Sequence, residues 1–198
     1  MEKDSKGQII EVALKLFGDH GMNDVSLNQV IKASGLSKGA VYHHFPSKQE
    51  LIKACVIAFW EQMTMEIINA PIENMPLKDV LSLLQLKSAE IIEEGQKSND
   101  SIFELYIAML FYVRKAPELL PIPQKYFGAF KKKLVDCIKN DQERGTIRKD
   151  ISADTTVLLI LSAAEGHGLY TISGVLENPQ KELENLLNQI YNSIVVAK

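Results

Sequence analysis

The sequence predicts an all-α protein of about nine helices, with a small N-terminal three-helix segment followed by a larger helical bundle. Apolar residues recur at spacings of three and four along almost the whole chain, and no long stretch alternates with a period of two. Helix caps, prolines and glycines divide the chain into segments of helical length. The 198 residues, of which 46% are apolar and 24% charged, are enough to bury a sizeable core.

The first two helices are predicted at the N-terminal end of the chain. One apolar face over residues 9–17 indicates the first helix, which Gly21 ends. The second helix begins at Ser26, whose side chain forms a capping box with that of Gln29. It ends at Gly35, because glycine readily adopts the left-handed conformation of a tight turn.

Proline and serine set the limits of the next two helices. The third begins at Ser37 and ends before Pro46, since proline has no backbone N–H and clashes with the preceding turn. The fourth begins at a second capping-box pattern, 47–50, and continues to about residue 70, before Pro71. Five further helices are expected over residues 77–95, 100–115, 122–144, 153–174 and 179–196.

Several classes of function find no support in the residues. The chain has no GxSxG, Walker loop, HExxH or paired-carboxylate motif, so we expect no enzyme activity and no cofactor. Cys55 and Cys137 are far apart in no metal-like spacing, which predicts two reduced packing residues and no metal site. The N-terminal residues lack the apolar core of a signal peptide, and the longest apolar run, 157–161, cannot span a bilayer. We therefore expect a cytoplasmic protein without a membrane partner.

Residues 26–45, SLNQVIKASGLSKGAVYHHF, predict a helix-turn-helix. Val30, Ile31 and Ala33 give the first of its helices an apolar face, while Leu36 and Val41 are placed to fill the space between the two. The side chains in the first turn of the second helix are mostly small, which lets the backbone at this helix N-terminus approach a phosphate closely. Any two short capped helices can produce this pattern, so the residues on either side of it are needed to identify a DNA-binding helix-turn-helix.

Those surroundings resemble the DNA-binding domain of the TetR family of bacterial transcriptional regulators. The matching residues are Ile9, Ile10, Ala13, Leu16, Phe17, Gly21, Ser26, Leu27, Val30, Ile31, Ala33, Gly35, Leu36, Ser37, Lys38, Gly39, Ala40, Tyr42, His44, Phe45, Ser47, Lys48 and Leu51. The resemblance implies a nine-helix fold, a DNA-binding domain over residues 3–63, and a ligand-binding and dimerisation domain over residues 64–198.

The predicted DNA-contacting residues lie in or beside the helix-turn-helix. The resemblance implies a phosphate contact for Tyr42 and Lys48, whose alternatives are packing and a solvated surface position. Lys38 is best placed to reach a base edge, with guanine O6 and N7 as acceptors. Adjacent histidines on a helix point about 100° apart, so His43 and His44 suit the groove or a phosphate better than a metal ion. The full set is Ser26, Asn28, Ser37, Lys38, Gly39, Ala40, Tyr42, His43, His44 and Lys48.

The resemblance also implies a cavity for a small-molecule effector in the C-terminal part. Candidate lining residues are apolar or aromatic, and core packing is the alternative role for each of them: Trp60, Met63, Phe103, Tyr106, Met109, Phe111 and His167. Residues 102–113 are apolar nearly all round, which predicts a helix buried in the centre of a bundle.

In the TetR family the last two helices of each subunit form the dimer interface. This chain offers a matching apolar stripe, for which packing within one subunit is the alternative: Leu158, Leu161, Leu169, Leu183, Leu186, Leu187, Ile190, Tyr191 and Ile194. The resemblance therefore implies a homodimer that binds double-stranded operator DNA.

The expected function is that of a repressor that binds a palindromic operator and is released by a small molecule. The alternatives are a sensor with a vestigial DNA-binding head and an activator of the same fold. The net charge of −3 argues against a general nucleic-acid coat, but the charge is unevenly distributed. Between Val25 and Gln49 there are three lysines, two histidines and no acid. The sequence thus predicts a small basic head on an acidic bundle.

Overall fold

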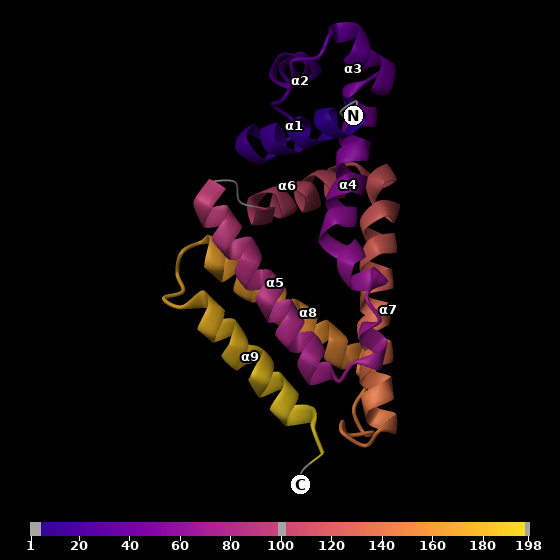
Figure 1. The fold of residues 1–198 in the computed structure, drawn as a ribbon, viewed down its shortest axis with the longest axis vertical. Coiled ribbons are helices and arrows are strands. Elements are labelled where there is room, and N and C mark those ends of the chain that lie inside the picture. The colour runs from indigo at the N-terminus through magenta and orange to yellow at the C-terminus, as the bar shows by residue number, and fades with distance from the viewer. Residues whose placement is uncertain (1–4, 99–101, 197–198) are drawn as a thin grey trace. The chain divides into compact units, whose positions relative to one another are not determined.

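The computed structural model describes residues 5–98 and 102–196; for Ile67 and residues 91–92, 94–98 and 102–104 it describes the backbone alone. Within these ranges the chain forms nine α-helices and no strand, which confirms the predicted all-α class (Figure 1). The helices are α1 Ser5–His20, α2 Leu27–Ser34, α3 Lys38–His44, α4 Lys48–Asn69, α5 Leu77–Ser98, α6 Ile102–Lys115, α7 Pro121–Glu143, α8 Ala153–Ile172 and α9 Pro179–Ile194. Two short 3₁₀ turns, η1 Ile72–Asn74 and η2 Pro117–Leu119, connect α4 to α5 and α6 to α7.

The chain divides into two compact units. The first consists of residues 1–65 and 95–126, and the second of residues 66–94 and 127–198. The predicted N-terminal domain, 3–63, falls inside the first unit, which also contains α6. Helices α4, α5 and α7 each contribute residues to both units.

In the first unit, α1 packs against α2, α3 and α6 (Figure 1). Its buried face, Ile9, Ala13 and Phe17, is the apolar stripe that the sequence predicts. Gln8 Nε2 donates a hydrogen bond of 2.9 Å to the carbonyl oxygen of Ser34, which joins α1 to the last residue of α2. The short helices α2 and α3 are therefore held in place by packing against α1.

Two sequence predictions about apolar faces are wrong in this unit. Ala33 is exposed and Ser34 is buried in its place, with Ser34 Oγ donating to the carbonyl oxygen of Ile31 at 3.0 Å. Helix α6 is not buried all round, since Leu110 and Phe111 are exposed while Met109 is fully buried. An apolar composition does not distinguish these two faces, because only the packing decides which of them is covered.

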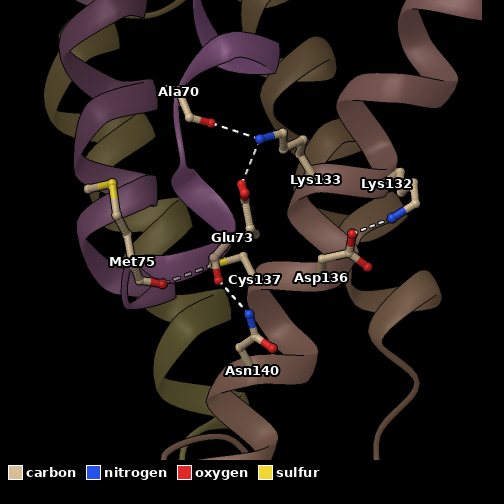
Figure 2. Close-up of polar contacts among 8 residues, drawn as sticks. All are labelled: Ala70, Glu73, Met75, Lys132, Lys133, Asp136, Cys137 and Asn140. Atoms are coloured by element: carbon tan, nitrogen blue, oxygen red, sulfur yellow. Dashed lines mark hydrogen bonds and ion pairs between the residues drawn. The ribbon is translucent and has the colours of Figure 1, made fainter.

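In the second unit, side chains of α7 hold the connection between α4 and α5 (Figure 2). Lys133 Nζ donates to the carbonyl oxygen of Ala70 at 3.0 Å and pairs with Glu73 at 2.7 Å. The hydrogen bond from Lys133 to the Glu73 carboxylate lowers the pKa of Glu73. Asn140 Nδ2 donates to the carbonyl oxygen of Glu73 at 2.7 Å. Successive turns of α7 thus satisfy polar groups of the connection between α4 and α5.

A buried carboxylate of α7 also binds the backbone at the start of α5. Asp141 is 2% exposed, and its Oδ2 accepts a hydrogen bond of 2.8 Å from the backbone N–H of Leu77. Its Oδ1 accepts from Arg144 Nη1 at 3.2 Å, and Arg144 Nη2 donates to the carbonyl oxygen of Asn74. A negative charge at a helix N-terminus also interacts favourably with the helix dipole.

Helices α8 and α9 pack side by side over the core of this unit (Figure 1). An isolated antiparallel bridge between Ile147 and Val195 ties the chain after α9 to the turn before α8. Both cysteines of the chain are free and buried, Cys55 in the first unit and Cys137 in the second. Burial raises the pKa of each thiol to about 12, so the thiolate is scarce at neutral pH. Such cysteines act as packing residues, as the sequence predicts.

Candidate functional site

Helix α2 is fixed at both ends by the interactions that the sequence predicts. Ser26 Oγ accepts from the backbone N–H of Gln29 at 3.3 Å, and Gln29 Oε1 accepts from the backbone N–H of Ser26 at 2.7 Å. Both halves of the capping box are therefore present. At the other end Gly35 has φ of 68°, the left-handed conformation that favours glycine.

Helix α3 begins immediately after this turn and presents one face outward. Ser37 Oγ caps it by accepting from the backbone N–H of Ala40 at 3.1 Å. Val41 and Phe45 are buried and anchor the helix. Because these two residues face inward, Lys38 and Tyr42 lie on the exposed side. One face of α3 is therefore packed against the first unit and the opposite face is exposed.

All ten predicted DNA-contacting residues lie on this exposed part of the first unit or at its margin. Seven are exposed and three half-buried, the latter being Ala40, His44 and Lys48. The exposed ones are Ser26, Asn28, Ser37, Lys38, Gly39, Tyr42 and His43. The DNA contacts themselves stay a prediction.

Two of the three lysines in this region have defined positions. Lys38 Nζ lies 5.6 Å from the centre of the Tyr42 ring, a cation–π contact that holds both side chains on one face of α3. Lys48 Nζ donates a hydrogen bond of 2.8 Å to the carbonyl oxygen of Asn23. The sequence does not indicate this acceptor, because the loop before α2 and the start of α4 are 25 residues apart. The ammonium group of Lys48 is thereby placed beside the N-terminus of α4.

No metal site is found in the part of the chain that the structure describes, where no group of three His, Cys, Asp or Glu side chains converges. The His43 and His44 rings meet edge to face, with centroids 5.3 Å apart.

Among the described residues, no helix is long and apolar enough to cross a membrane.

Two of the candidate effector-binding residues of the first unit, Trp60 and Tyr106, belong to an aromatic cluster. Trp60 and Tyr106 meet edge to face at 5.9 Å, and Phe59, which the sequence analysis misses, stacks on Tyr106 at 6.3 Å. Met63 is half-buried and Met109 fully buried. Phe111 is 60% exposed, which argues against a place in an enclosed cavity. The side chain of Phe103 lies outside the described residues.

His167, the candidate in the second unit, is 7% exposed on α8. Its Nε2 has no hydrogen-bond partner among the described residues, while Thr171 Oγ1 lies 3.5 Å from its Nδ1. Thr171 Oγ1 donates its own hydrogen to the carbonyl oxygen of His167, at 3.0 Å.

The predicted dimer stripe divides into buried and exposed parts. Leu161, Leu183, Leu187, Ile190 and Ile194 belong to the core of the second unit, and Leu186 and Tyr191 pack against that core. Their burial is therefore explained within one chain. Leu158 and Leu169 are half exposed on α8, beside Leu159 and Tyr170, which the sequence analysis does not name. The exposed apolar face thus lies on α8.

The family model described as "Bacterial regulatory proteins, tetR family" matches residues 9–55, the segment that contains α2, α3 and the capped turns described above. Residues 9–55 of this chain are thus a TetR-type DNA-binding segment.

Curated HTH-type transcriptional regulators and a solved structure are similar to this chain as well. YuxN of Bacillus subtilis, an HTH-type transcriptional regulator, is 37% identical over 67 residues, which span 34% of this chain but only 23% of that protein. The HTH-type transcriptional repressor DhaR of a Mycobacterium species is 24% identical over 189 residues, 94% of this chain and 90% of that protein. The complex of SmeT, a repressor from Stenotrophomonas maltophilia, with triclosan shares the fold at a TM-score of 0.77 and 15% identity, covering 98% of this chain and 93% of that one. Transcriptional regulation is thus the common property of these proteins.

Proposed function

We propose that this TetR-family protein is a homodimeric repressor that binds a palindromic operator and is released by a small molecule. The observation that carries the DNA-binding part is the outward face of α3, where Lys38 and Tyr42 are held together above the buried anchors Val41 and Phe45. Two copies of this helix would enter successive major grooves, roughly 34–36 Å apart. Phosphate contacts would fix the position on the duplex, and Lys38 would read bases.

The basic character of this face supports the proposal further. The Val25 to Gln49 segment contains no carboxylate side chain that would repel DNA phosphates. Its few lysines indicate a modest number of phosphate contacts and a moderate dependence of affinity on salt.

The effector response is proposed on separate grounds. SmeT, which has the same fold, is solved in complex with triclosan. In this chain two buried polar atoms, Trp60 Nε1 and His167 Nε2, have no partner among the described residues. Helix α4 contributes residues to both units, so its tilt would couple an effector to the spacing of the two α3 helices in a dimer. Such couplings are typically about 1–3 kcal/mol.

An electrophoretic mobility shift with the DNA upstream of the protein's own gene tests the DNA-binding part. We expect sequence-selective binding that weakens as salt is raised, and a marked loss in Tyr42→Ala, which removes an exposed ring from α3 without touching a buried anchor. A sensor with a vestigial head would show neither selective binding nor a Tyr42 effect. Repressor and activator differ in promoter geometry, so a transcription assay with the same DNA separates them.

The oligomeric state is tested by sedimentation at micromolar concentration. We expect a particle of twice the 22.2 kDa chain mass, because the half-exposed Leu158 and Leu169 leave an apolar face on α8 that a second copy would cover. Leu169→Glu should shift the population toward monomer. A monomeric wild-type protein would contradict the two-half-site geometry.

A further inference from the structure

The side chain of Trp60 contains a buried hydrogen-bond donor that nothing in the described chain accepts. Trp60 is 7% exposed, and its Nε1 has no partner among the residues that the structure describes. Native proteins avoid burying an N–H without an acceptor, because the group loses its hydrogen bonds to water and gains nothing in return. A bound molecule that carries an acceptor atom would satisfy this donor.

Two aromatic rings pack against the indole of Trp60. Phe59 meets the indole edge to face at 6.1 Å, and Tyr106 does so at 5.9 Å. Thr64, one turn further along α4, is buried, and its hydroxyl donates to the carbonyl oxygen of Trp60 at 2.6 Å. Met63 is half-buried on the same helix, and methionine side chains repack readily around a bound molecule.

We propose that the effector is a neutral aromatic molecule bearing one acceptor oxygen, such as a ketone, ester, amide or ether, which accepts a hydrogen bond from Trp60 Nε1. The inference rests on the proposed small-molecule response and defines the chemistry of its ligand. Aromatic rings pack favourably against the cluster of Phe59, Trp60 and Tyr106, and the acceptor satisfies the one buried donor.

The charge of the ligand follows from the same geometry. A cation is disfavoured at the N–H edge of an indole, because that edge carries the positive end of the ring's charge distribution. A carboxylate would lose its hydration against a single neutral donor, which costs more than one hydrogen bond returns. A neutral acceptor avoids both penalties.

Trp60 is the only tryptophan of the chain, so its indole N–H gives a single, unambiguous resonance in a ¹H–¹⁵N NMR spectrum. We would titrate the full-length protein with acetophenone, ethylbenzene, benzoate and phenyltrimethylammonium. Acetophenone is expected to move this resonance downfield and saturably, as a new hydrogen bond does, and ethylbenzene, which lacks the oxygen, to move it much less. No shift with acetophenone up to its solubility limit would overturn the proposal, as would a larger saturable shift with either charged compound.

The variant Trp60→Phe keeps a ring and removes the N–H. Calorimetry on folded wild-type and variant protein should show that the preference for acetophenone over ethylbenzene falls by about twofold to tenfold, the worth of one neutral hydrogen bond. An unchanged preference would contradict the assigned donor. The mobility-shift assay keeps the two hypotheses apart: operator binding without an indole shift refutes only the ligand class, whereas an indole shift without operator binding refutes only the repressor.

Discussion

Replacing Asp141 by alanine is expected to lower the free energy of unfolding by about 2–4 kcal/mol. The buried carboxylate accepts the backbone N–H of Leu77 at 2.8 Å, and alanine would leave that N–H buried without an acceptor at the start of α5. The favourable interaction with the dipole of α5 would be lost as well. Because Arg144 is nearly half exposed, it regains water and adds little to the cost. Urea unfolding followed by circular dichroism measures the change.

Two further variants separate this explanation from a general effect of removing an acid from α7. Asp141→Asn keeps an oxygen that can accept the Leu77 N–H, so we expect it to lose roughly half as much stability or less. Asp136→Ala removes a carboxylate whose partner is the exposed Lys132 (Figure 2). Surface pairs of this kind contribute about 0–1 kcal/mol, so a small change is expected. Equal losses in Asp136→Ala and Asp141→Ala would refute the capping role.

The sequence allowed the helices to be predicted because their limits depend on local chemistry. Ser26 with Gln29 and the left-handed Gly35 act within a few residues, so the pattern alone reveals both ends of α2. The fastening of the α4–α5 connection could not be predicted in this way. Asp141 and Leu77 are 64 residues apart, and an aspartate within a helix is usually exposed to water.

The same distinction between local and long-range interactions applies to the residues of the candidate site. The exposed face of α3 follows from helical periodicity once Val41 and Phe45 are recognised as anchors. The apolar stripe of α9 illustrates the limit, because periodicity shows that Leu187 and Ile190 face apolar surroundings but not whether those belong to the same chain. Only the three-dimensional positions of side chains far apart in the sequence show which chain covers the stripe. That Trp60 Nε1 has no partner among the described residues is likewise seen only from their positions in space, not from the sequence.

The lysines of the proposed DNA interface are expected to act in different ways. Lys38 is exposed on the first turn of α3, from which its side chain can reach a base edge. Lys38→Ala should therefore weaken binding to the preferred operator by about 1–3 kcal/mol for each copy of α3 and relax discrimination between sequences. Lys48 is held at the N-terminus of α4 by the carbonyl oxygen of Asn23, which suits a phosphate contact. Lys48→Ala should weaken selective and non-selective binding to a similar extent.

The salt dependence of the affinity distinguishes the two lysines quantitatively. Each lost phosphate contact reduces the slope of log K against log salt by about 0.9, so Lys48→Ala in a dimer should reduce it by about 2. Fluorescence anisotropy with operator and scrambled duplexes over a range of salt concentrations provides both quantities. Lys78→Ala, at an exposed lysine of the second unit, is the matched control and should leave the slope unchanged. If Lys38→Ala weakened operator and scrambled DNA alike, Lys38 would contact the backbone. Because base contacts and phosphate contacts respond differently to sequence and salt, the two measurements together assign each lysine its role.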